Sequence, residues 1–179
     1  GKSTIARLIP RFYEPTAGRI LIDGQDITQV SISSLRQAIG GVQQDPFLFT
    51  AAVDHNIAYA DPSVAMDKII QASTDSQIHS FIDELPKNYQ TLVGEDGVSL
   101  SGGQKQRISI ARGTLTGAPI LIFDDATSAI DAGTEQHIRR ALYNRAGSHT
   151  TIIISHRLVS MMHADEILFL EEGRIIERG

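Results

Sequence analysis

The sequence has 179 residues, of which 41% are hydrophobic and 21% are charged, a balance that is ordinary for one compact globular domain. It contains no cysteine, which excludes disulfides and thiolate metal sites and agrees with a reducing compartment. The net charge is −5 at pH 7, so electrostatics gives no reason to expect a nucleic-acid partner. No apolar run reaches the roughly 18 residues that a membrane helix requires.

The first quarter of the chain begins with a helical pattern and continues with strands. Apolar residues at helical spacing predict a helix over 3–12 that ends near Pro10 and the Glu14-Pro15 turn. A strand is expected over 18–23, where an Asp-Gly turn closes it. A short helix is predicted over 33–38, and a strand follows over 39–43. Helix and strand signals therefore alternate in this part of the chain.

The middle of the chain is dominated by helical patterns. Helices are predicted over 53–59, 64–73 and 78–85, and a fourth helix opens at Ser101. Before this fourth helix, residues 92–100 have the composition of a loop that two glycines punctuate. We therefore expect a helical insertion between two parts of the chain that carry strands.

After residue 119 the chain alternates between strands and helices again. Strands are predicted over 120–123, 150–154, 166–170 and 174–177, and a helix is predicted over 134–144. Short apolar strands separated by helices are typical of a buried parallel sheet with helices on its faces. The predicted fold class is therefore α/β, with a mainly parallel sheet.

The domain organisation follows from the same pattern. We predict a single domain over 1–179, with a core made of 1–50 and 114–179 and a helical insertion over about 51–113. The sequence starts without an initiator methionine, inside a motif described next, and stops just after a strand-like run. We therefore expect it to be a piece of a longer protein.

The first four residues, Gly1, Lys2, Ser3 and Thr4, resemble the second half of a phosphate-binding loop, G-x-x-x-x-G-K-[ST]. Such a loop presents backbone N–H groups and a helix N-terminus to an anion. Lys2 is then expected to reach the β- and γ-phosphates, and the Ser3 hydroxyl to bind Mg²⁺. Half a motif is equally compatible with a chance helix start, so this assignment depends on support from elsewhere in the chain.

A pair of carboxylates gives that support. The apolar strand predicted over 120–123 delivers Asp124 and Asp125 to the edge of the sheet where α/β proteins bind ligands. Asp124 is expected to hold the water shell of a Mg²⁺ ion that Ser3 helps to bind. The alternative is that the two aspartates only cap the strand and solvate the turn that follows.

Residues 100–107 read LSGGQKQR and place a serine and two glycines at the head of a predicted helix. A helix start of this kind can bind an anion, and glycines let backbone N–H groups approach a phosphate closely. The alternative is an ordinary serine cap with a flexible turn. The string resembles the signature LSGGQ-x-Q-R of the ATP-binding domains of ABC transporters.

The resemblance to this family extends over the whole chain. It implies a P-loop NTPase core with an inserted α-helical subdomain, and ATP and Mg²⁺ as ligands. It also implies a head-to-tail pair in which each ATP lies between the phosphate loop of one subunit and the signature of the other. The residues that the resemblance places at the nucleotide are Gly1, Lys2, Ser3, Thr4, Ser101, Gly102, Gly103, Gln104 and Asp131.

Three further residues occupy positions that resemble family motifs. Gln44, in VQQD, resembles the Q-loop glutamine that ligates Mg²⁺ and senses the transmembrane partner. Asp131, in SAID, resembles the D-loop, which crosses to the opposite subunit. His156, in ISHR, resembles the switch histidine that contacts the γ-phosphate. Each residue alone is better explained by a structural role, so these assignments depend on the order and spacing of all the motifs together.

Several features resemble exporters in particular. Residues 91–97 resemble the X-loop, in which Glu95 would touch the intracellular loops of the membrane domains, although a solvated acidic turn is the alternative. Residues 11–15 and 155–158 are also similar to exporter sequences. The resemblance implies transmembrane domains in the same full-length chain, at the cytoplasmic face of a membrane such as the plasma membrane. The fragment itself would then be peripheral.

One residue departs from the family pattern. The family usually has a glutamate after the Mg²⁺-binding aspartate, as the general base that polarises the attacking water, but this chain has Asp125. The shorter side chain withdraws the carboxylate by about 1.5 Å, and a misplacement of about 1 Å can cost on the order of 100-fold in rate. We expect a slow site that still binds ATP. An aspartate here resembles the degenerate half of a heterodimer, whose intact signature completes the partner's fast site, and the alternative is a homodimer that tolerates aspartate.

The expected site residues fall into two further groups besides those at the nucleotide. The expected catalytic residues are Asp125, His156 and Gln44. The expected Mg²⁺ ligands are Ser3, Gln44 and Asp124. The resemblance also implies an adenine-stacking aromatic, two or three strands and the first half of the phosphate loop before Gly1, so we expect the isolated piece to be unstable and to bind ATP poorly.

Two other functions are compatible with parts of the pattern. The first is a soluble ABC-type ATPase of DNA repair or translation, but chromosome-maintenance versions insert long coiled coils, and no sustained heptads separate Lys2 from Ser101 here. The second is a P-loop kinase or a nucleotide-binding regulator, which leaves the signature, the D-loop and His156 unexplained. Membrane helices upstream of Gly1 would distinguish an exporter from both.

Overall fold

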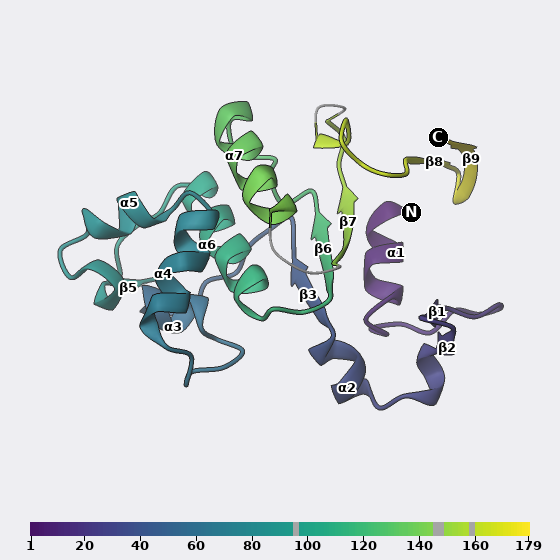
Figure 1. The fold of residues 1–179 in the computed structure, drawn as a ribbon, viewed down its shortest axis with the longest axis horizontal. Helices are drawn as coiled ribbons and strands as arrows, with labels where there is room; N and C mark the ends of the chain where they lie inside the picture. The colour runs from purple at the N-terminus through teal and green to yellow at the C-terminus, as the bar shows by residue number, and fades with distance from the viewer. Residues whose placement is uncertain (95–96, 145–148, 158–159) are drawn as a thin grey trace.

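The structure, a computed structural model, describes residues 1–94, 97–144, 149–157 and 160–179. Within these residues a parallel sheet of three strands lies at the centre, with helices on both faces (Figure 1). The strands follow the order β3-β6-β7 and all run parallel. Their bounds are Ile39–Val42 for β3, Ile120–Asp124 for β6 and Thr150–Ile154 for β7. The predicted α/β class with a parallel sheet is confirmed.

Helix α1 covers one face of the sheet, and helices α6 and α7 cover the other (Figure 1). Their bounds are Lys2–Leu8 for α1, Gly102–Leu115 for α6 and Ala132–Tyr143 for α7. Side chains of β6 alternate between the two faces. Ile120 and Ile122 pack on α1, whereas Leu121 and Phe123 pack on α6 and α7. Because both faces are buried, β6 is a continuous apolar run instead of an alternating one.

The register of the sheet brings the carboxyl ends of its strands to one edge. Val42 of β3 pairs with Phe123 of β6, and Asp124 of β6 pairs with Ile154 of β7. Parallel α/β sheets bind their ligands beyond this edge. The segments that leave the three strands therefore start side by side where a ligand is expected.

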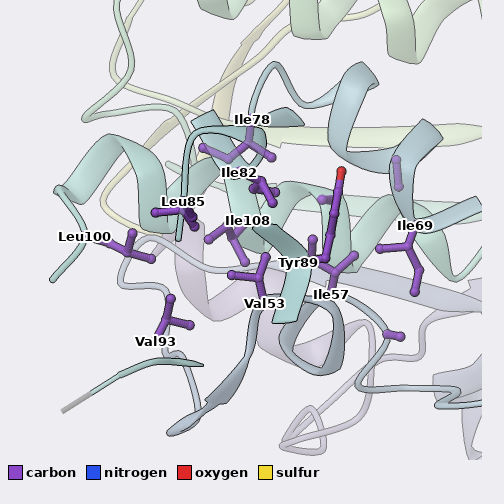
Figure 2. Close-up of a cluster of buried hydrophobic side chains, with 13 residues drawn as sticks. Val53, Ile57, Ile69, Ile78, Ile82, Leu85, Tyr89, Val93, Leu100 and Ile108 are labelled. Carbon is purple, nitrogen blue, oxygen red and sulfur yellow. The ribbon is translucent and has the colours of Figure 1, made fainter. Parts of the chain in front are cut away.

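The middle of the chain packs around a hydrophobic cluster of its own (Figure 2). Its elements are β4 (Ala51–Ala52), α3 (Val53–Ile57), α4 (Met66–Asp75), α5 (His79–Asp83), the 3₁₀ helix η2 (Asn88–Gln90) and β5 (Leu92–Val93). Helix α6 joins this part to the sheet, because Ile108 packs in this cluster and Ile110 packs in the cluster beneath α7. The limits predicted for the helical insertion, about 51 and 113, remain a proposal.

The structure differs from the expected loop over 92–100, because β5 pairs antiparallel with β4 there. Asn56 of α3 holds the chain just before this pair of strands. Its buried side chain bonds to both backbone polar groups of Phe49 (2.9 and 3.0 Å) and to the carbonyls of Ala51 and Ala52. A buried amide with several backbone partners fixes a short strand that apolar periodicity does not reveal.

Two hairpins lie outside the parallel sheet. They are β1 (Leu21–Ile22) with β2 (Gln25–Asp26), and β8 (Leu168–Glu171) with β9 (Arg174–Arg178). Strands were expected at β1, β8 and β9 but not at β2, and the structure shows that each pair is antiparallel. The two-residue turns Asp23-Gly24 and Glu172-Gly173 have positive φ at both positions (49° and 77°, 46° and 80°). This is the type I′ geometry that joins antiparallel strands, which explains the pairing.

The remaining elements are η1 (Ile27–Gln29) and α2 (Ile32–Gln37). Helix α1 ends close to Pro10, as expected, and does not continue to residue 12, because Pro10 lacks the N–H group that would bond to the carbonyl of Ala6. Among the helices in the described part of the chain, none is both long enough and apolar enough to cross a membrane.

Candidate functional site

The phosphate-binding residues expected at the start of the chain meet the strand-borne carboxylate in space. The Ser3 hydroxyl on α1 donates a hydrogen bond of 3.1 Å to Oδ1 of Asp124 at the end of β6, although 121 positions separate them in sequence. Ala6 of α1 packs with Ile120 and Ile122 of β6, which holds the helix beside the strand. The hydrophobic cluster on this face therefore positions the polar pair.

Lys2 brings a second strand, β7, to the same place. Its Nζ lies 3.4 Å from Nδ1 of His156, which follows β7 and is exposed. Because an ammonium group only donates, Nδ1 accepts, and this contact assigns the neutral ring a proton on Nε2. Lys2, Ser3, Asp124 and His156 thus form one group at the carboxyl edge of the sheet, which we call the edge cluster.

The edge cluster suits a divalent cation that is shared with a phosphate. Ser3 and Asp124 offer two hard oxygen atoms side by side. The described residues contain no group of three or more His, Cys, Asp or Glu side chains that could hold a metal ion by themselves. Mg²⁺ commonly binds through one or two carboxylates together with substrate phosphates and waters. The residues therefore fit a Mg²⁺ ion that arrives with a phosphate ligand.

Asp125 follows β6 directly and turns the chain away from the sheet. Its φ is +48°, in the left-handed region, where aspartate is more frequent than most residues. Its N–H donates to the carbonyl of Ile154 over 2.8 Å, and its carbonyl accepts from the N–H of Ser128 over 3.3 Å. The backbone of Asp125 is therefore fixed next to β7, between Asp124 and the segment that carries His156.

Residues 101–104, which we call the signature turn, cap helix α6. Ser101 Oγ accepts from the N–H of Gln104 (3.3 Å), and Gln104 Oε1 accepts from the N–H of Ser101 (2.8 Å). The helix itself provides no acceptor for the N–H groups of Gly102 and Gly103, because they lie in its first turn. The capping box uses acceptors, so the groups left to bind a ligand are mainly donors. The signature turn therefore suits an anion.

The two glycines of the signature turn differ in their surroundings. A Cβ atom on Gly103 would lie 2.8 Å from the carbonyl oxygen of Ala129, too close without a backbone shift. A Cβ atom on Gly102 would lie 3.6 Å from Cβ of Ala129, which is ordinary contact. From the sequence, both glycines are expected to let a phosphate approach the backbone closely. In the structure, Gly103 also leaves room for the loop after β6, which packs against it.

Asp131 caps helix α7. Its Oδ1 accepts from the N–H of Thr134 over 2.9 Å, and the hydrogen bonds from Thr134 lower the pKa of the Asp131 carboxyl below its usual value. Helix capping is a structural role of the kind that the sequence left open for this residue. The expected contact of Asp131 with an opposite subunit remains a prediction.

Three other expected site residues lie around these groups. Gly1 precedes α1 as its N-cap, Thr4 is exposed on α1, and Gln44 is exposed in the bend after β3. In the part of the chain that the structure describes, no hydrogen bond joins the Gln44 side chain to the edge cluster, so its role as a Mg²⁺ ligand remains a prediction. The expected contact residue Glu95 lies outside the described residues.

Sequence patterns missed the residues that hold the loop after β6. Arg157, next to His156, donates to the carbonyls of three residues of this loop and to the carboxylate of buried Glu135 (3.2 Å). Gln106 on helix α6 forms hydrogen bonds with Ser128 and Ala129 of the same loop. Gln106 lies within the LSGGQKQR string, but that string indicated a phosphate contact and no contact with this loop. Glu135 is a polar residue on a helix face that also bears apolar residues.

Comparisons with known proteins agree with this geometry. The family model described as ABC transporter matches residues 1–128. The whole chain is 49% identical to the ATP-dependent lipid A-core flippase of Syntrophus aciditrophicus and 47% identical to ABC transporter B family member 18 of Arabidopsis thaliana. It spans 30% of the flippase and 15% of the plant protein.

A solved structure gives the same result in three dimensions. A chain described as a bacterial Atm1-family ABC exporter with ATP bound matches all of this chain, with a TM-score of 0.95 and 49% sequence identity. The match covers 32% of that exporter chain. Fold and sequence therefore agree over the full length of the 179 residues.

Proposed function

The chain belongs to the ABC transporter family, and from this premise we propose that it is the ATP-binding part of an exporter, in which ATP binding and hydrolysis drive transport. Its fold is that of a P-loop NTPase, as the sequence predicted. The chain spans about 31% of the bacterial ABC proteins that it matches, so transmembrane domains in the same full-length chain are part of the proposal. The domain then lies at the cytoplasmic face of a membrane such as the plasma membrane.

The observation that carries the proposal is the edge cluster. Lys2 supplies a positive charge for the β- and γ-phosphates of ATP, while Ser3 and Asp124 supply oxygen atoms for Mg²⁺. Bound Mg²⁺ neutralises phosphate charge. When Nδ1 of His156 accepts from Lys2, its Nε2–H is left to donate a hydrogen bond to a terminal phosphate. A cation, two metal-binding oxygens and an imidazole at the carboxyl edge of a parallel sheet suit a nucleoside triphosphate.

The signature turn provides a second phosphate-binding surface on each chain, separate from the edge cluster. Its free groups are mainly donors and suit a phosphate, but α6 and α1 cover opposite faces of the sheet (Figure 1). We propose that the signature turn serves a nucleotide held by the edge cluster of a second ATP-binding domain, arranged head to tail. That second domain belongs to an identical or a sister subunit.

The alternative is a soluble ABC-type ATPase without a transport role. The matched relatives favour the exporter, because one is described as a flippase and a matched structure as an exporter. Gln44 and Glu95 are the residues through which a transmembrane partner would be sensed. The substrate that is transported depends on residues outside this chain.

Replacing Lys2 by alanine tests the proposal directly. A charge-assisted hydrogen bond contributes about 1.5–3 kcal/mol, so the dissociation constant for Mg-ATP should rise about 10- to 100-fold. Binding is measured by titration of the full-length protein with a fluorescent ATP analogue. The matched control is Lys87→Ala, which removes the same charge from an exposed position in the helical part. If both variants bind Mg-ATP like the wild type, the phosphate site is not at the edge cluster.

A further inference from the structure

Gln106 of helix α6 is a buried amide with three partners. Gln106 is only 3% exposed to solvent. Nε2 donates to Oγ of Ser128 over 2.9 Å and to the carbonyl of Gln44 over 3.4 Å. Oε1 accepts from the N–H of Ala129 over 2.9 Å. One side chain therefore touches both the segment after β3 and the loop after β6.

The orientation of this amide is determined by its partners. The backbone N–H of Ala129 can only donate, so the side-chain oxygen of Gln106 must face it, and the NH₂ group must face Ser128. A buried amide loses free energy unless it is hydrogen-bonded. The Gln106 amide therefore has one favourable orientation. Because Gln106 is part of α6, a movement of this helix changes the hydrogen bonds from Gln106 to the loop.

The loop 127–130 is also held from the opposite side. The guanidinium group of Arg157 donates to the carbonyls of Thr127 (3.3 Å), Ser128 (3.2 Å) and Ile130 (3.0 Å). Arg157 is the residue after His156 of the edge cluster. The loop thus lies between the amide of Gln106 on α6 and the segment that carries the candidate γ-phosphate contact.

The start of α6 packs on the same loop. The carbonyl oxygen of Ala129 approaches Gly103 so closely that a Cβ there would lie 2.8 Å from it. Gly103 belongs to the signature turn, and Gln106 follows it by less than one helical turn. A ligand that moves the signature turn therefore moves Gln106 with it, as parts of one rigid helix.

We propose that Gln106 is a positioning residue that links the signature turn to the hydrolytic residues of its own chain. Through Ser128 and Ala129 it sets the loop that begins at Asp125, and through that loop it acts on the segment of His156. A phosphate bound at the signature turn, on the partner's nucleotide, then adjusts the chain's own site. This inference rests on the proposed function, because it assigns a coupling role within the proposed ATPase.

The test variant is Gln106→Met, which keeps the length and volume of the side chain but removes its amide. The groups it leaves behind in Ser128 and Ala129 are in exposed residues and can bind water, so the fold should survive. We expect kcat for ATP hydrolysis to fall on the order of tenfold or more. The dissociation constant for Mg-ATP should stay within about twofold of the wild type, because Gln106 does not touch the edge cluster.

The matched control is Ile108→Val, which removes one methyl group from a fully buried position two residues further along α6. It should lower the unfolding temperature at least as much as Gln106→Met and leave kcat unchanged. In a Ser128→Ala background, Gln106→Met should cost less of kcat than in the wild type, because one of its bonds is already gone.

The outcomes separate this inference from the proposed function. If the full-length wild type neither binds nor hydrolyses ATP, the proposed function fails. If the wild type is active and Gln106→Met keeps its kcat, only the positioning role fails. The positioning role is also overturned if Ile108→Val loses as much kcat as Gln106→Met. The same holds if Gln106→Met costs as much kcat in the Ser128→Ala background as in the wild type. Either result would mean that the loss of kcat reflects the packing of α6 alone.

Discussion

Replacing Asp125 by glutamate is expected to raise the ATPase turnover of the chain's own site on the order of 10- to 100-fold. The extra methylene extends the carboxylate by about 1.5 Å, and a misplacement of about 1 Å can cost on the order of 100-fold in rate. The backbone of Asp125 is fixed by its hydrogen bond to Ile154, so the longer side chain starts from the same place. Single-turnover hydrolysis of Mg-ATP by the full-length protein measures the change.

Asp125→Asn is the companion variant. If the aspartate is already too short to act as an effective base, removing its charge should change turnover by less than about threefold, while Mg-ATP binding stays the same. A steep loss in Asp125→Asn, or no gain in Asp125→Glu, would show that aspartate is a competent base here. The positive φ of Asp125 would then be the better explanation for aspartate, because this residue tolerates the left-handed region.

Replacing Gly103 by alanine is expected to lower turnover on the order of 10- to 100-fold. The added Cβ would lie 2.8 Å from the backbone oxygen of Ala129, so the signature turn and the loop after β6 must move apart. The same shift withdraws preorganised N–H donors from the phosphate, and removal of one preorganised donor from an oxyanion hole costs about 100- to 1,000-fold in rate. Steady-state ATPase assays of the full-length protein measure the effect.

Gly102→Ala is the matched control for Gly103→Ala. It places the same methyl group in the same turn, but at 3.6 Å from Ala129 Cβ, where it makes ordinary contact. We expect its turnover to fall less than about fivefold. Both variants gain helix propensity in the first turn of α6, so any difference between them reflects the loop and not the helix. Equal losses would mean that the contact with Ala129 does not matter.

The sequence predicted the central elements because their patterns are local and strong. Strand β7 has the predicted bounds, and β6 extends the predicted strand by one residue, Asp124. Both are short apolar runs bounded by turn residues, which is the pattern of a buried strand. The two-residue strands β4 and β5 carry no such pattern, since pairing in the folded chain and the buried amide of Asn56 define them.

The candidate site was predictable in its parts but not in its internal bonds. The proximity of Ser3 and Asp124 was expected, because a phosphate-loop remnant and a strand-borne carboxylate both belong at the carboxyl edge of the sheet, but their direct hydrogen bond was not. The hydrogen bonds from Gln106 and Arg157 to the loop after β6 were not expected. These contacts join residues far apart in sequence mainly through backbone carbonyls and an N–H, which leave no mark on the residues that provide them.

The most direct test is an electron cryomicroscopy structure of the full-length protein trapped with Mg-nucleotide. We predict that Ser101 and the N–H groups of Gly102 and Gly103 bond to the terminal phosphate of a nucleotide whose other phosphates lie at Lys2 of the opposite subunit. A signature turn that faces solvent would contradict this prediction. So would a nucleotide that contacts Lys2 and Ser101 of one and the same chain.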